Sequence, residues 1–121
     1  MKVKRINIGI KDVYTALDEF VTAGELLVRG EPVNEESGIY FTSMESFRKA
    51  VTPKRLELLH IIKTTRPASI NQLAKLAHRN IKNVAEDVKY LVQIGLVETM
   101  EQDRCLAPRV DYDEISLKIA V

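Results

Sequence analysis

The sequence is poor in the residues that build metal and nucleophilic centres. It holds one cysteine, Cys105, and two histidines, His60 and His78, among its 121 residues. A lone cysteine excludes an internal disulfide, and these three residues do not offer the ligand spacing of a zinc site. The sequence also has no Gly-x-Ser-x-Gly motif, no glycine-rich phosphate loop and no histidine–carboxylate cluster. We therefore expect neither an enzyme nor a cofactor or metal site, with His60 on a helix surface or at the edge of the core and Cys105 within a strand.

Long apolar runs and a net excess of one charge are also absent. No apolar run approaches the roughly 18 residues that span a bilayer, and no small-residue cleavage site follows the alternating N-terminal segment. These absences predict a cytoplasmic protein without a membrane segment or signal peptide. The net charge is +1, but residues 43–110 hold twelve basic and seven acidic residues. A positive excess confined to this segment is what a DNA-contacting module needs.

The N-terminal third combines a strand, a helix and a loop. With 45% apolar residues the chain can bury the core of one domain, with or without a small appendage. Residues 2–10 alternate between polar and apolar side chains, which predicts a half-buried strand. Residues 12–28 carry an apolar stripe at helical spacing. Residues 29–38 hold the Gly, Pro, Asn and Ser of a loop, and this loop, followed by a short strand over 39–42, is the predicted domain boundary.

Helix-capping residues divide the centre of the chain into four predicted helices. Ser43 caps a short helix, and Thr52 with Pro53 begins a second one that ends near Arg66. Ser69 opens a capping box with Gln72, which begins a third helix. A fourth helix runs from its cap Asn80 to Ile94 and stops at Gly95. The apolar stripes of these helices predict a core of Leu56, Leu59, Ile61 or Ile62, Ile70, Leu73, Ala74, Ala77, Ile81, Val84, Val88, Leu91 and Val92.

A hairpin and a terminal strand follow the last helix. Leu96–Met100 and Cys105–Val110 flank the predicted turn 101–104, and Pro108 makes the second strand an edge. Residues 115–121 alternate regularly, which predicts a strand that requires a partner. The N-terminal strand or the strand over 39–42 could supply this partner, within the chain or from a second copy.

The run LAKLAHRNIKNVAEDVKYLVQIGLVE (73–98) resembles the winged helix-turn-helix of MarR/ArsR-like transcriptional regulators. Residues 43–110 are similar to small prokaryotic predicted regulators, some of which are encoded beside toxin-like partners. The resemblance implies an α+β fold and sequence-specific binding of double-stranded DNA by a transcriptional regulator such as a repressor. It implies a recognition helix over about 80–94 in the major groove and a wing over 96–110 on the DNA backbone. The expected domains are an extension over 1–42, the winged helix over 43–110 and a terminal strand over 111–121.

A helical wheel separates the two adjacent carboxylates of the expected recognition helix. With Val84, Val88 and Leu91 turned inward, Asp87 lies beside the buried stripe, where it can pair with a basic residue such as Arg55. The first turn of a recognition helix enters the groove first. Asparagine, lysine and glutamate can pair with adenine, guanine and cytosine, respectively. The outward face carries Lys82, Asn83, Glu86, Lys89, Tyr90 and Gln93; we predict base contacts by Ile81, Lys82, Asn83 and Glu86, and phosphate contacts by Lys75, Arg79, Lys89 and Arg104.

Two alternatives stay open at this point. The acidic wing turn and Glu86 fit a winged helix that contacts protein, as an antitoxin-like or assembly subunit, without reading DNA. The helix over 12–28 and the terminal strands exceed what a minimal winged helix requires, which predicts a homodimer. In the alternative, these elements only complete the core of a monomer.

Overall fold

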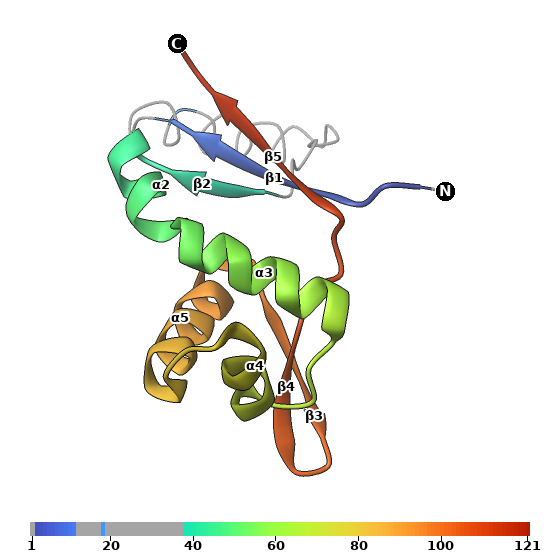
Figure 1. Ribbon diagram of the computed structural model, residues 1–121. Coiled ribbons are helices and arrows are strands. Elements are labelled where there is room, and N and C mark those ends of the chain that lie inside the picture. Colours follow the sequence, from blue (N-terminus) through green and yellow to red (C-terminus); the bar gives the residue numbers. More distant parts are fainter. Residues whose placement is uncertain (1, 12–17, 19–37) are drawn as a thin grey trace. The chain divides into compact units, whose positions relative to one another are not determined.

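A computed structural model describes residues 2–11, 18 and 38–121 (Figure 1). The chain divides into two compact units, one of Met1–Lys4 with Val51–Asp113 and one of Arg5–Ala50 with Glu114–Val121. The predicted α+β winged helix-turn-helix is confirmed, while the predicted helix over 12–28 lies outside the described residues. The elements are β1 (Arg5–Ile10), β2 (Ile39–Phe41), α2 (Met44–Ala50), α3 (Pro53–Thr65), α4 (Ile70–Ala77), α5 (Ile81–Ile94), β3 (Glu98–Gln102), β4 (Cys105–Arg109) and β5 (Glu114–Ile119).

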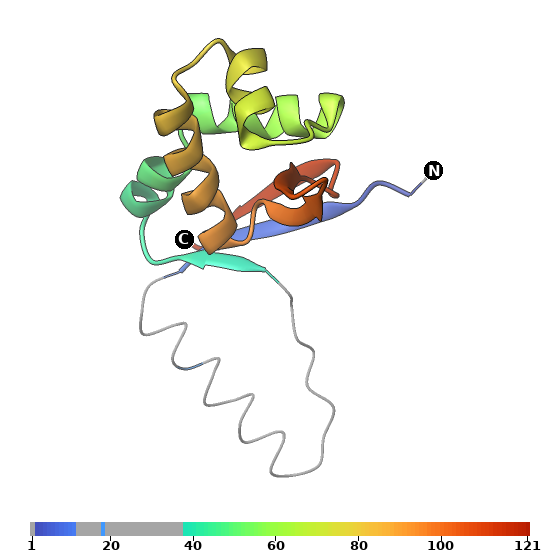
Figure 2. The same cartoon turned by 90° about the horizontal axis from the view of Figure 1, so that it is seen from below.

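One unit is built on a parallel sheet in the order β2-β1-β5. Figures 1 and 2 show β1 beside β2. On its other side β1 pairs with β5, so strands from the two ends of the described chain are neighbours. Ile8 pairs with Leu117 and with Ile39, so the isoleucines of β1 share one face with the apolar residues of both neighbours. Ile8 is fully buried there. Of the two predicted partners for the terminal strand, the N-terminal strand is therefore the observed one.

Aromatic rings pack on both faces of this sheet. On one face Phe47 of α2 meets Phe41 edge to face, with ring centroids 5.7 Å apart. On the opposite face the ring of Tyr40 lies across Gly9, where an added Cβ would come within 2.7 Å of Tyr40 Cδ1. The ammonium of Lys11 stands 4.2 Å from the centre of the same ring. Glycine is thus needed at position 9 because the tyrosine occupies the space of a side chain.

The other unit places α3, α4 and α5 around one core, and each helix begins at its predicted cap. Thr52 Oγ1 accepts from the Arg55 amide at 3.2 Å, and Ser69 Oγ accepts from the Gln72 amide at 3.1 Å. Asn80 Oδ1 accepts from the Lys82 amide at 2.8 Å. These side chains bond amides that have no partner inside the helix, so they define where each helix starts.

The core differs from the prediction at three positions. Leu56, Ile81 and Val92 were predicted to be buried but are 46%, 48% and 37% exposed. In α3 the buried residues are Leu58, Leu59 and Ile62. Leu56 lies about 200° around the helix from Leu58, so both cannot face the same core. The fully buried side chains of this unit include Leu58, Ile62, Leu73, Val84, Leu91 and Leu96.

The first strand of the wing lies two residues further along the chain than predicted, and the turn is tighter. Glu101 and Gln102 belong to β3, and Gln102 pairs with Cys105, so only Asp103 and Arg104 form the turn. Both turn residues have positive φ, 50° and 66°. A two-residue turn with two positive φ angles matches the right-handed twist of the flanking strands, and this match lets the ladder continue to the tip. The predicted four-residue turn is therefore wrong.

Arg66 provides a test of backbone strain at the end of α3. It caps the helix with φ 48° and ψ 62°, a left-handed conformation that favours glycine, and it also precedes Pro67. We expect Arg66→Gly to raise the free energy of unfolding by roughly 0.5–1 kcal/mol, because relief of strain outweighs the added entropy of the unfolded chain. Urea unfolding measures this effect. Glu57→Gly within α3 is the control and should lower stability by a similar amount; destabilisation by Arg66→Gly would contradict the strain.

Candidate nucleic-acid interface

The turn between α4 and α5 is closed by backbone hydrogen bonds. His78 adopts a left-handed conformation with φ 54°, and its amide donates to the Lys75 carbonyl at 3.2 Å. The Arg79 amide donates to the Ala74 carbonyl at 3.1 Å. This pattern satisfies the last carbonyls of α4. His78 thus takes the role that glycine often has in such turns, and Asn80 can begin α5 only two residues later.

The carboxylate of Asp87 pairs with two arginines and does not lie on the exposed face of α5. Its carboxylate accepts from Arg55 Nε at 3.1 Å and from Arg79 Nη2 at 2.9 Å. The three side chains are 17%, 19% and 21% exposed, respectively. The Arg55 guanidinium also lies 4.3 Å from the centre of the Tyr90 ring. This cluster joins α3, the turn and α5, and it confirms the predicted pairing of Asp87 with Arg55.

Arg79 is held differently from an exposed phosphate ligand. Its Nη2 bonds Asp87, and its Nη1 is buried without a hydrogen-bond partner among the described residues. The predicted phosphate contact of Arg79 stays a prediction, whereas its contact with Asp87 is observed.

The remaining predicted contact residues are exposed on α4, α5 and the wing tip. Lys75 projects from α4, and Arg104 lies in the wing turn. Glu86 is exposed, and within the described parts of the chain it forms no ion pair with Lys82. The exposed residues of the predicted recognition face are Ile81, Lys82, Asn83, Glu86, Lys89 and Gln93.

Arg109 anchors the wing to the loop before α4. Its Nη1 donates to the Pro67 carbonyl at 2.7 Å, and its Nη2 donates to Gln102 Oε1 at 2.9 Å. At the base of the hairpin the Tyr112 hydroxyl donates to the Leu96 carbonyl at 2.8 Å, and burial, with the nearby Asp111 charge, raises the pKa of this tyrosine. Sequence reasoning missed both residues. Their contacts position the wing.

An apolar groove of about 360 Å³ separates α5 from the wing. It is lined by apolar side chains of both elements, and Leu106 on the wing is 61% exposed. Val92, which the sequence placed in the core, lines this groove because it lies beside Val88 on the flank of α5. The other lining residues are Ile70, Ala85, Lys89, Gln93 and Thr99.

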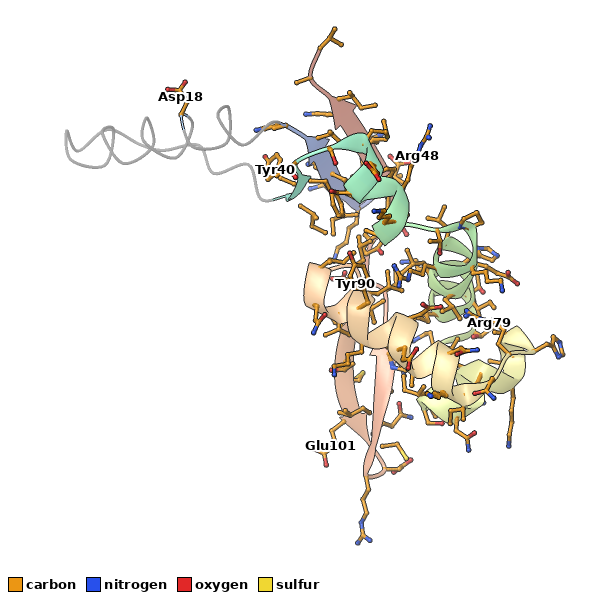
Figure 3. All side chains as sticks on the ribbon, turned by 90° about the vertical axis from the view of Figure 1, so that its left-hand side faces the viewer. Asp18, Tyr40, Arg48, Arg79, Tyr90 and Glu101 are labelled. Atoms are coloured by element: carbon orange, nitrogen blue, oxygen red, sulfur yellow. The ribbon has the colours of Figure 1, made fainter. Side chains whose placement is uncertain are left out.

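Charge is unevenly distributed over these elements. The wing carries Glu98, Glu101 and Asp103 beside Arg104, and Figure 3 shows Glu101 near the end of the hairpin. The exposed side chains of α4 and the first half of α5 are mainly basic or neutral. Any contact with a polyanion is therefore most favourable at α4 and α5, with Arg104 as the cation of the wing turn.

Two further findings on the described residues concern metal ions and membranes. Among residues 2–11, 18 and 38–121, no group of three or more His, Cys, Asp and Glu side chains is placed to hold a metal ion. None of the helices in these ranges has the length and apolar character needed to cross a membrane.

Comparisons with known proteins were positive for a family and for solved structures. Residues 50–117 match the family model described as HVO_A0114. The homodimeric winged helix-turn-helix DNA-binding domain of Mb0332 from Mycobacterium bovis, a possible ArsR-family transcriptional regulator, is similar with a TM-score of 0.47 at 15% identity, over 80% of this chain and 68% of that chain. The multiple antibiotic-resistance repressor MarR from Listeria monocytogenes has a TM-score of 0.45 at 18% identity, over 85% and 67%. No curated protein sequence matches.

Proposed function

The chain belongs to the HVO_A0114 family, and we propose that it is a transcriptional regulator that binds double-stranded DNA with its winged helix. In this proposal α5 enters the major groove and the wing turn contacts the backbone. The observation that carries it is the exposed first turn of α5, the second helix of the helix-turn-helix, which presents Lys82 and Asn83.

Sequestration of Asp87 supports the proposal. An exposed carboxylate beside phosphate is repelled, and the contacts with Arg55 and Arg79 neutralise this one. Glu86 is then the single acidic residue of α5 that faces solvent, and a lone glutamate can accept from cytosine N4. The acidic residue in the middle of the recognition helix is thus compatible with base readout.

In this proposal some residues contact the edges of bases and others contact phosphates. Lys82, Asn83 and Glu86 lie on the first turns of α5 and suit base edges. Lys75, Lys89 and Arg104 are exposed cations that suit phosphates. Arg79 is a further proposed phosphate ligand, although its guanidinium also pairs with Asp87.

Salt dependence tests the proposal directly. We expect the affinity for duplex DNA to fall as salt rises, because each neutralised phosphate releases counterions. Lys75→Ala or Arg104→Ala should weaken binding to all sequences alike and lower the salt slope by about one unit. Fluorescence anisotropy on specific and random duplexes at several salt concentrations measures both quantities.

Lys49→Ala on α2 is the matched control, since it removes the same charge outside the compact unit that holds α3, α4, α5 and the wing. It should leave the slope unchanged. An affinity for DNA that does not respond to salt, or equal slopes for all the variants, would contradict the phosphate contacts.

A second candidate function is favoured by the groove between α5 and the wing. Its apolar lining and the 61% exposure of Leu106 suit an apolar protein partner. Such a winged helix would contact protein without reading DNA. Tight binding that is insensitive to salt, together with no duplex binding, would identify this function.

We also propose that the protein acts as a homodimer through its strand-rich unit and the segment preceding β2, residues 2–28 and 113–121. Two linked winged helices bind paired half-sites with an affinity that one short recognition helix does not reach.

A further inference from the structure

The strand β5 is an open edge of the parallel sheet among the described strands. It extends over six residues, whereas the other edge strand, β2, has three. An edge strand presents unpaired N–H and C=O groups that can pair with another strand. Two apolar residues of β5, Leu117 and Ile119, are 40% and 50% exposed. The edge therefore combines unpaired backbone groups with exposed apolar surface.

The direction of the backbone groups of β5 follows from one hydrogen bond at its end. The Ala120 amide donates to the Ile10 carbonyl at 3.4 Å, while Ile10 is in register with Ile119. Because successive amides of a strand point to opposite sides, the amides of residues 114, 116 and 118 face β1. The amides and carbonyls of Ile115, Leu117 and Ile119 therefore face the open edge.

The sequence of this edge is complementary to itself in the antiparallel direction. With Ser116 opposite Ser116 of a second copy, Ile115 lies opposite Leu117, and Glu114 lies opposite Lys118. Apolar residues then meet on one face of the sheet, and opposite charges meet on the other. Such cross-strand pairs are the unit of sheet stabilisation.

Neighbouring registers lose this match. A shift by one residue places Ile115 opposite Lys118 and brings apolar and polar faces together. A shift by two, with Leu117 opposite Leu117, keeps the faces but places Glu114 opposite Ala120. Only the register centred on Ser116 pairs both charges, and within the described chain Lys118 has no ion pair that this contact would replace.

We propose that β5 pairs antiparallel with β5 of a second copy of the chain, centred on Ser116, and so joins two three-stranded sheets into one. The inference rests on the homodimer of the proposed function and identifies its interface. A two-fold axis through such an interface makes every contact occur twice, as in other symmetric dimers. The Glu114 carboxylate, already paired with Arg5, would then bridge Arg5 and the second copy's Lys118.

Substitution of Leu117 tests the backbone pairing. Proline lacks the amide that faces the open edge, but it leaves the amides that face β1 intact. We expect Leu117→Pro to raise the dimer dissociation constant at least about tenfold, since two symmetric hydrogen bonds are lost. Leu117→Thr, which keeps the amide and suits a strand, is the matched control and should remain a dimer. Sedimentation of the full chain without DNA measures both, and circular dichroism verifies folding.

A charge exchange tests the register. Lys118→Glu and Glu114→Lys should each weaken self-association about tenfold, because two attractive pairs become repulsive. An equimolar mixture of the two variants should associate again, since every 114–118 pair between the copies then joins opposite charges. Failure of the mixture to associate would overturn this register.

The two proposals fail in distinguishable ways. Sedimentation without DNA does not depend on DNA binding, so a dimer that does not bind duplexes would overturn only the proposed function. A parent chain that is monomeric at tens of micromolar would overturn the homodimer and the β5 interface together. A Leu117→Pro variant that dimerises like the parent would overturn the β5 interface alone.

Discussion

Asp87→Ala is expected to lower the free energy of unfolding by about 3 kcal/mol, because it leaves two partly buried arginines without their common partner. Arg55 and Arg79 converge on this carboxylate from α3 and from the turn before α5. Their side chains are 19% and 21% exposed, so solvent compensates the lost charge only in part. For a unit of this size the melting temperature should fall on the order of 15 °C. Thermal denaturation followed by circular dichroism measures the change.

Glu86→Ala is the matched control for this experiment, because it removes a neighbouring carboxylate that is exposed. It should change stability by less than about 0.5 kcal/mol. In a background in which both arginines are replaced by methionine, Asp87→Ala should cost far less, since the cycle isolates the interaction. Equal melting temperatures for the Asp87 and Glu86 variants would refute the structural role of the cluster.

Asn83→Ala is expected to weaken binding to the preferred DNA site by roughly 1–3 kcal/mol, or about 5- to 150-fold, while binding to random DNA changes little. The reason is that a lost base contact removes discrimination, whereas phosphate contacts hold every sequence. Asn83 is exposed on the first turn of α5, so the substitution should leave the melting temperature unchanged. Binding isotherms on both duplexes measure the two affinities.

Glu86→Gln separates two roles of the remaining acidic residue. If Glu86 accepts from a cytosine, the variant should relax preference at one base pair; if it only repels phosphate, binding to every sequence should tighten. If the Asn83→Ala variant binds both duplexes with the same affinity as the parent, the proposal that α5 lies in the major groove is wrong.

The boundaries of the helices could be predicted because their determinants are local. Thr52, Ser69 and Asn80 each bond an amide two or three residues away, and Gly95 supplies the left-handed end of α5. The hydrophobic pattern of α3 was less informative. Because Leu56 and Leu58 are both apolar, periodicity alone did not identify which of them faces α4 and α5.

Contacts between distant segments could not be predicted in the same way. Arg109 bonds the carbonyl of Pro67, 42 residues earlier, and any backbone carbonyl offers the same acceptor. The partner of β5 was left open between two strands, since alternation determines which face is apolar but not which neighbour is chosen. The Asp87–Arg55 pair was predicted because the helical wheel placed a carboxylate beside the core, where an unpaired charge is costly.

The connection between β1 and β5 has a consequence for the order of folding. Arg5 and Glu114 are in register although 109 residues separate them, and the winged helix lies between them in the sequence. Closing so long a loop in an unfolded chain is slow, whereas α3, α4, α5 and the wing make contacts within one continuous segment. We therefore expect the winged helix to form first and to shorten the effective loop that the sheet must close. Refolding of the Asp87→Ala variant should then delay the sheet as well as the helices, although no atom of Asp87 belongs to a strand.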